Sequence, residues 1–372
     1  MRVLIAPDCF GGTLSAVQAA EAIEQGWQRG APADEPVLRP LADGGPGFVE
    51  VLHAALGGIV HSVEVTGPVG EPVVARWLQH ETTGYLEAAQ ACGLHLVPFE
   101  QRDATIATSR GVGELLAAAR DTGLNTVVVG LGGSASSDGG AGALAALGAV
   151  AVDTAGRPLA AGGAALVRCA RLDGRAAIAG LRLVAAADVT NPLLGRYGAA
   201  EVFAPQKGAG PEQVRRLEAA LTRWADVLEQ ATGRAVRELP SAGAAGGLGA
   251  ALLGLGAEQV SGAGLVAGLT GLDDALDRAE LVITGEGSFD WQSLRGKLVT
   301  TLAEGAAARG LPCLVLAGQV SVGRREAAAA GVSAAYAAAE LAGSVQAALA
   351  DPAGTLAAVA EHAARHWGGR SL

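Results

Sequence analysis

Five short loops in the sequence combine an acidic side chain with glycine or another small residue. These loops are residues 7–12, 42–45, 130–142, 188–192 and 284–290. Glycine lets backbone N–H groups come close to an anion, and a helix that begins after such a loop adds its positive end. Aspartate and glutamate can hold Mg²⁺, which keeps several of its waters and needs few protein carboxylates. A phosphate cradle, a metal and a base for the attacking hydroxyl are the parts that phosphoryl transfer needs.

Each of these loops, taken alone, also has an ordinary structural explanation. Asp-Gly and Gly-Gly are common turn dipeptides, and Asp8, Asp188 or Asp290 could serve as a helix N-cap. A site is favoured because the loops follow apolar runs that are typical of buried strands, such as RVLIA at 2–6. In an open parallel sheet, ligands bind beyond the carboxyl ends of the strands, which is where these loops would lie.

Lysine is almost absent from the chain. Of 27 basic side chains, only Lys207 and Lys297 are lysine, and the others are arginine. Both stand beside glycine, in QKG and RGK. In a chain that otherwise uses arginine, a remaining lysine can mark a place that needs a compact ammonium. Survival by chance on a solvated face is the alternative.

The composition excludes some classes of protein. The formal net charge of −10 argues against a nucleic-acid surface, which needs clustered lysine and arginine. The four cysteines form no CxxC or Cys/His metal spacing, which indicates a reduced, intracellular protein. The start, MRVLIAPD, is too short for a signal peptide, and no apolar run approaches about 18 residues. We therefore expect a cytoplasmic protein with no membrane partner.

Strand and helix patterns alternate at both ends of the chain. In the first 58 residues, the apolar strand at 2–6 precedes a helical pattern that Thr13 or Ser15 could cap, and a second strand and helix follow. Short apolar strands separated by helices return after about residue 278. Such alternation is typical of a parallel sheet covered by helices on both faces.

The middle of the chain has a different pattern. Residues 61–89 alternate or are β-rich, as antiparallel hairpins are, and an amphipathic helix is expected over 212–233. Further strands are expected at 125–133, 181–189 and 199–205. We therefore predict an α/β fold in which residues 1–65 and 281–372 form one discontinuous domain and residues 66–280 form an inserted mixed α+β domain. Two sequential domains are the alternative.

Several common enzyme motifs are absent from the sequence. There is no GxxxxGK[ST] phosphate loop, no GxSxG and no HExxH. The run GLGGSA does not complete GxGxxG, which disfavours a nicotinamide-dependent dehydrogenase. His362 and His366 lie one helical turn apart, but an exposed helix surface explains that spacing better than a metal site does.

Six motifs make the sequence similar to a known family. They are APDCFGGTLSA at 6–16, ADGGPG at 42–47, GLGGSASSDGGAG at 130–142, DVTNPLLGRYGAAEVFAPQKGA at 188–209, GAAGGLGA at 243–250 and ITGEGSFDWQSLRGK at 283–297. In these motifs, which span nearly the whole chain, the sequence resembles the class I glycerate kinases. It departs from that family at Gly11, where the family usually has lysine, and at Pro46, where the family usually has glutamate.

The resemblance implies both a fold and an activity. The fold would be a flavodoxin-like or Rossmann-like parallel-sheet domain with a second α/β domain inserted. The activity would be that of an ATP- and Mg²⁺-dependent kinase that phosphorylates D-glycerate, usually on the 2-hydroxyl.

On this reading, the loops provide candidate residues for each role. Asp188 would be the base that takes the acceptor proton, and Asp43 and Asn191 would orient the acceptor. Glu286 and Asp290 would hold Mg²⁺, or contact ribose instead. The residues expected to bind substrate or phosphate are Asp8, Gly132, Gly133, Ser134, Asp138, Lys207 and Lys297. We expect the loop 130–142 to wrap a phosphate group, with its small residues leaving room for the ligand.

The sequence leaves several alternatives open. The acceptor could be another short hydroxy acid or polyol, because the departures at Gly11 and Pro46 each remove a charged side chain. The chain could also be a catalytically weak protein that binds a nucleotide or another ligand on the same fold. The sequence does not decide between 2- and 3-phosphorylation, the oligomeric state or domain closure.

Overall fold

The described chain forms two compact units. The computed structural model describes residues 1–178, 180–294 and 298–368. Unit 1 comprises Met1–Ala42, Glu50–Leu56 and Val266–Leu372, and unit 2 comprises Asp43–Val49 and Gly57–Leu265. Residues 57–65 thus belong to unit 2 and residues 266–280 to unit 1. The division into domains at 65/66 and 280/281 stays a prediction.

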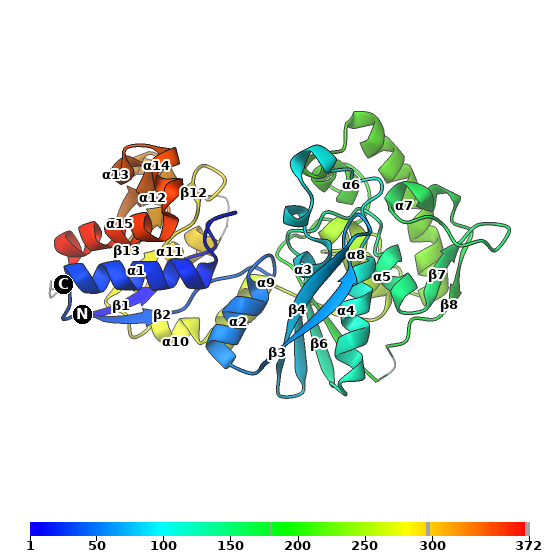
Figure 1. Cartoon of the computed structure of the whole chain (residues 1–372), viewed down its shortest axis with the longest axis horizontal. Helices are drawn as coiled ribbons and strands as arrows, with labels where there is room; N and C mark the ends of the chain where they lie inside the picture. The colour runs from blue at the N-terminus through cyan, green and yellow to red at the C-terminus, as the bar shows by residue number, and fades with distance from the viewer. Residues whose placement is uncertain (179, 295–297, 369–372) are drawn as a thin grey trace. The chain divides into compact units, whose positions relative to one another are not determined.

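Unit 1 is built on a five-stranded parallel sheet (Figure 1). The strands in spatial order are β2 (Glu35–Leu38), β1 (Arg2–Ile5), β11 (Leu281–Thr284), β13 (Cys313–Ala317) and β15 (Ala334–Ala337). Counted along the unit, this order is 2-1-3-4-5, the strand order of flavodoxin-like doubly wound folds. The order reverses between β1 and β11, so the topological switch point lies there.

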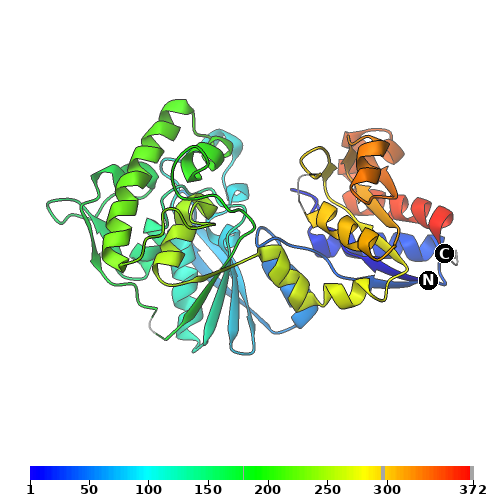
Figure 2. The same cartoon turned by 180° about the vertical axis from the view of Figure 1, so that it is seen from behind.

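Helices cover both faces of this sheet. On one face, α1 (Ala16–Gly30) and α15 (Pro352–Trp367) lie side by side, in blue and red in Figures 1 and 2. They approach closely because Gly26 has no side chain: a Cβ there would lie 1.9 Å from the Ala357 carbonyl oxygen. The opposite face buries Leu4 against α10 (Leu272–Leu276) and α11 (Leu298–Ala308).

The remaining elements of unit 1 are short. They are the paired strands β12 (Ser288–Phe289) and β14 (Gln319–Val320) and the helices α12 (Arg324–Ala329), α13 (Ala338–Ala342) and α14 (Val345–Ala350). The helix that Thr13 or Ser15 was expected to cap begins after Ser15. The Ser15 hydroxyl accepts from the Gln18 N–H, and the Gln18 side chain accepts from the Ser15 N–H. This capping box fixes where α1 starts.

Unit 2 contains a six-stranded mixed sheet. In spatial order the strands are β10 (Glu258–Val260), β9 (Arg182–Ala186), β6 (Thr126–Gly130), β5 (Thr83–Glu87), β4 (Pro72–His80) and β3 (Ile59–Thr66). The first four run parallel, and β3 and β4 form the antiparallel part. The predicted α/β fold class, with parallel sheets, is therefore confirmed.

The other elements of unit 2 surround this sheet. They are α3 (Ala88–Cys92), α4 (Arg110–Asp121), α5 (Ala141–Ala146), α6 (Ala199–Phe203), α7 (Pro211–Thr232), α8 (Ala244–Gly254) and the two-stranded ribbon β7 (Ala149–Val152) with β8 (Arg171–Gly174). Two further helices, α2 (Phe48–Leu56) and α9 (Gly262–Thr270), each contribute residues to both units.

The strand expected at 199–205 was wrong, because this segment forms helix α6. Its buried residues are Ala199, Ala200 and Ala204, whereas Val202 is 41% exposed. Burial at this spacing follows one face of a helix and does not alternate as in a strand. Alanine also favours the helix, and Pro205 begins a separate short turn.

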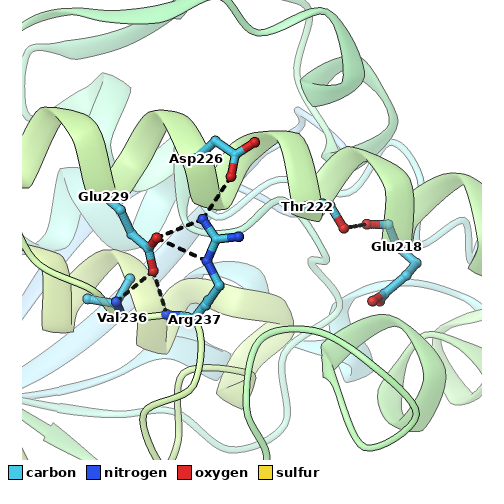
Figure 3. A network of polar contacts seen from close by, with 6 residues as sticks. All are labelled: Glu218, Thr222, Asp226, Glu229, Val236 and Arg237. Atoms are coloured by element: carbon cyan, nitrogen blue, oxygen red, sulfur yellow. Dashed lines mark hydrogen bonds and ion pairs between the residues drawn. The ribbon is translucent and has the colours of Figure 1, made fainter.

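Side chains of helix α7 hold the segment around Val236 and Arg237 in place by hydrogen bonds (Figure 3). The carboxylate of Glu229 accepts from the backbone N–H groups of Val236 and Arg237 at 2.8 and 2.9 Å, and it also binds the Arg237 guanidinium. Asp226 accepts a further hydrogen bond from Arg237 at 2.8 Å. The Arg237 carbonyl in turn accepts from the Leu193 N–H. Through this network α7 positions the loop that follows β9.

Candidate functional site

A cavity in unit 2 lies at the carboxyl ends of the parallel strands β6 and β9. Its volume is about 360 Å³. We call it the unit 2 cavity. Six of the predicted site residues line it: Asp43, Gly132, Gly133, Ser134, Asp188 and Lys207. The fold thus brings together residues that are up to 164 positions apart in the chain, as the carboxyl-edge rule predicts.

Two glycine-rich loops pack against each other beside this cavity. The Gly132 N–H donates to the Gly44 carbonyl at 3.0 Å. A Cβ on Gly130 would lie 2.4 Å from that same carbonyl oxygen, and a Cβ on Gly132 would lie 2.5 Å from Gly45 Cα. Any larger residue would therefore push the loops apart. These glycines serve close backbone packing, besides the room for a ligand that the sequence led us to expect.

Gly133 and Ser134 form the part of the loop that can hold an anion. Gly133 adopts φ +74°, and its carbonyl accepts from the Leu94 N–H at 2.8 Å. No described residue accepts a hydrogen bond from the N–H of Gly133 or Ser134, and both residues line the cavity. Adjacent N–H groups of this kind are suited to a phosphate or carboxylate oxygen. A Cβ on Gly133 would lie 2.8 Å from the ring of Pro46.

Lys207 places a buried positive charge on the wall of the cavity. The residue is 3% exposed, and its Nζ donates to Ser134 Oγ at 3.1 Å and to the Ser136 carbonyl at 2.6 Å. Burial lowers the pKa of this ammonium to about 8. An ammonium has three donors, and within the described chain these two oxygens are its partners, so one N–H remains for a ligand.

Two carboxylates share the cavity with Lys207. Asp188 follows β9, and its carboxylate accepts from Ser261 Oγ at 2.5 Å and from the Ala263 N–H at 2.9 Å. These contacts at the start of α9 fix the orientation of an exposed side chain. Asp43 is also exposed, and its Oδ1 accepts from the Gly45 N–H at 2.9 Å. An oriented carboxylate is what a general base requires.

Two predicted residues of unit 2, Asp138 and Asn191, do not line the unit 2 cavity. Asp138 is 1% exposed, and its Oδ2 accepts from the N–H and the hydroxyl of Ser109 at 2.8 and 3.0 Å, while Oδ1 accepts from the Gly140 N–H. These bonds hold the glycine-rich loop onto the start of α4, so Asp138 organises the loop. Asn191 donates from Nδ2 to the Tyr197 carbonyl at 2.7 Å and thereby shapes the loop after β9.

The sequence analysis assigned no role to several residues that line this cavity, among them Phe203, Gln206, Ala244 and Ala245. Ala245 has φ +51° and is followed by Gly246 and Gly247, which are also left-handed. Gly246 fits under the loop only because it lacks a side chain, since a Cβ would lie 2.0 Å from the Ser136 carbonyl oxygen. The motif GAAGGLGA was the available signal for the two alanines.

A second cavity lies within unit 1, and we call it the unit 1 cavity. Its volume is about 490 Å³, and it is formed by loops that follow β1 and β11, on either side of the switch point. The predicted residues Asp8, Glu286 and Asp290 line it. Glu286 is 7% exposed. Gly11 lines it too, and a Cβ there would meet no atom within 4 Å.

The two predicted metal ligands, Glu286 and Asp290, both line the unit 1 cavity. Within the described residues, no group of three or more histidine, cysteine, aspartate or glutamate side chains is arranged to hold a metal ion. Lys297 lies outside the described residues.

Comparisons with known proteins agree with this structure. Residues 3–368 match the model of the Glycerate kinase family. The chain is 42% identical over 329 residues to the glycerate 2-kinase of Escherichia coli (strain K12), covering 86% of each sequence. An uncharacterised protein of Mycobacterium bovis is 47% identical over 372 residues, covering 99% of this chain and 92% of the relative.

A solved structure extends the comparison to the fold. The crystal structure of a protein provisionally named glycerate kinase 2, from Salmonella typhimurium LT2, matches with a TM-score of 0.80 and 38% identity over 98% of both chains. The chain therefore belongs to the glycerate kinase family. The predicted resemblance and the predicted enzyme class are both confirmed.

Proposed function

We propose that this protein transfers the γ-phosphoryl group of ATP to the 2-hydroxyl of D-glycerate, with Mg²⁺ as cofactor. The observation that supports this most directly is the content of the unit 2 cavity. A buried ammonium, two N–H groups without a described partner and two carboxylates line one space of about 360 Å³. Phosphoryl transfer depends mainly on such positioning and charge stabilisation.

Each residue then has a proposed part in the reaction. Asp188 accepts the proton of the glycerate hydroxyl while the oxygen of that hydroxyl attacks the γ-phosphorus of ATP. The bond between the γ-phosphorus and the β,γ-bridging oxygen breaks, and ADP leaves. The N–H groups of Gly133 and Ser134 and the ammonium of Lys207 stabilise the charge on the transferred group. Gly132 keeps this loop in place. Asp43 contacts the acceptor.

The other predicted residues have supporting roles in this proposal. Asn191 keeps the loop of Asp188 in shape, and Asp138 does the same for the glycine-rich loop. Asp8 is a contact to substrate in the unit 1 cavity, and Lys297 is a further phosphate contact. Mg²⁺, when bound, would neutralise phosphate charge, and the carboxylates that could hold it are Glu286 and Asp290.

The proposal also covers the cell compartment of the enzyme and the class of its substrate. No described helix is both long and apolar enough to cross a lipid bilayer. ATP and D-glycerate are small cytoplasmic molecules, so we propose a cytoplasmic enzyme that acts on a small-molecule substrate and not on nucleic acid.

A coupled assay of ADP release tests this function. Mg·ATP would be supplied with D-glycerate, with L-glycerate, with a panel of short hydroxy acids and polyols, and with no acceptor. We expect turnover that depends on D-glycerate. Turnover with another acceptor alone would keep the chemistry and reassign the substrate. ATP binding without turnover on any acceptor would overturn the proposal in favour of a nucleotide-binding protein.

A further inference from the structure

The unit 1 cavity has the position of a ligand site in its own right. It opens beside the loops after β1 and β11, where the strand order of the sheet reverses, and doubly wound sheets bind their ligands at such a switch point. Its volume of about 490 Å³ is larger than that of the unit 2 cavity and lies in the range of small-molecule sites.

One part of the cavity wall is apolar although it faces solvent. Leu349 and Val345, both on α14, line the cavity and are 54% and 38% exposed. Phe10 and Leu14, from the loop after β1, line it as well. Large apolar side chains exposed around one concave space indicate that an apolar ligand surface covers them.

The polar part of the wall carries only negative charge in the described chain. Asp8, Glu286 and Asp290 line the cavity, and none of its described lining residues is lysine or arginine. These carboxylates can accept hydrogen bonds from the hydroxyl groups of a ligand. The ligand should therefore combine a flat apolar part with neutral hydroxyls. The unit 2 cavity differs in that Lys207 lines it together with two carboxylates.

We propose that the unit 1 cavity binds the nucleoside part of the nucleotide, with the base against Val345 and Leu349 and the ribose hydroxyls donating to Glu286 and Asp8. This inference rests on the proposed kinase function, because it is that function which brings a nucleotide to the protein. It assigns Glu286 to ribose recognition and not to Mg²⁺.

The test measures ADP binding to the full chain by isothermal titration calorimetry in EDTA, so that no metal contributes. Leu349→Gln removes apolar contact without adding charge. Leu341→Gln is the matched control, because Leu341 is 48% exposed in the neighbouring helix α13 and does not line the cavity. We expect the dissociation constant of ADP to rise about five- to tenfold in the first variant and less than about twofold in the control. The affinity for tripolyphosphate, which has no nucleoside, should not change.

Ribose recognition is tested with 2′-deoxy-ADP and 3′-deoxy-ADP. In the wild type, loss of a hydroxyl that donates to a carboxylate should weaken binding about tenfold or more. In Glu286→Gln, whose shape is nearly the same, that penalty should fall below about threefold. A Glu286→Gln variant that weakens ADP only when Mg²⁺ is present would make Glu286 a metal ligand and overturn the ribose assignment.

Two further outcomes distinguish a failure of the proposed nucleoside site from a failure of the proposed kinase function. Equal ADP affinity in Leu349→Gln and Leu341→Gln, in an enzyme that phosphorylates D-glycerate, would overturn the nucleoside site and leave the function standing. A Leu349-dependent ADP affinity in a chain that phosphorylates no acceptor would support the nucleoside site and overturn the function.

Discussion

Replacing Lys207 by methionine should remove catalysis without loss of stability. Burial lowers the pKa of this ammonium from 10.5 to about 8, which corresponds to about 3 kcal/mol against keeping the charged form in the folded chain. Methionine fills a similar volume and carries no charge. It also gives up the hydrogen bonds to Ser134 Oγ and the Ser136 carbonyl, at a cost of about 1–3 kcal/mol. The free energy of unfolding should therefore be unchanged or higher by up to about 2 kcal/mol.

The catalytic activity of Lys207→Met should fall, although its stability should not. Loss of a preorganised charge at the transferred phosphoryl group should lower kcat with Mg·ATP and D-glycerate about 10²- to 10³-fold. Urea unfolding and the ADP-release assay on the same preparation measure both quantities. A variant that unfolds more readily but keeps its kcat would refute the reasoning, because Lys207 would then be a structural residue.

The pH dependence gives a second measurement on the same residue. Between about pH 8 and 10.5 the unfolded chain keeps a proton that the folded Lys207 has released. This group therefore makes the free energy of unfolding of the wild type rise with pH in that window, and the contribution should be missing in Lys207→Met. If the ammonium is the active form, kcat of the wild type should also fall as pH rises through about 8.

Three further substitutions test other parts of the structure. Asp188→Asn should lower kcat at least about 10²-fold with little change in KM, and an unchanged kcat would remove Asp188 as the base. Gly133→Val should abolish phosphate binding, since a Cβ would lie 2.8 Å from the Pro46 ring and φ is +74°; a variant with wild-type tripolyphosphate affinity would contradict the cradle. Burial raises the pKa of Glu87 from 4.5 to about 7, so between those values the folded chain holds a proton that the unfolded chain has lost, and stability should fall as pH rises. Glu87→Gln should remove that pH dependence and raise the free energy of unfolding at pH 8 by about 1–3 kcal/mol over the wild type. Equal urea midpoints for the two proteins at pH 8 would contradict a raised pKa of Glu87.

Much of the fold follows from the sequence because the signals are local. Apolar runs bounded by glycine and aspartate marked the central strands, and the Ser15 cap marked the start of α1. The segment 199–205 was misassigned because its alanines suit either state. Only the buried face that it shares with α7 and α8 decides for the helix.

The site was harder to predict because its contacts are distant in sequence. The rarity of lysine singled out Lys207, and the strand-end rule gathered Asp43, Asp188 and the glycine-rich loop. Nothing local distinguishes Asp138 from a ligand-binding aspartate, since its partner Ser109 lies 29 residues away. The close packing of Gly44 against Gly130 is likewise visible only in three dimensions.

The most direct test of the central claim is the ³¹P NMR spectrum of the product formed from Mg·ATP and D-glycerate. The wild type should give 2-phosphoglycerate and an equal amount of ADP, and Lys207→Met should form both about 10²- to 10³-fold more slowly. A product phosphorylated on the 3-hydroxyl would contradict the proposed transfer to the 2-hydroxyl. Wild-type ADP release without any phosphoglycerate would contradict the kinase assignment itself.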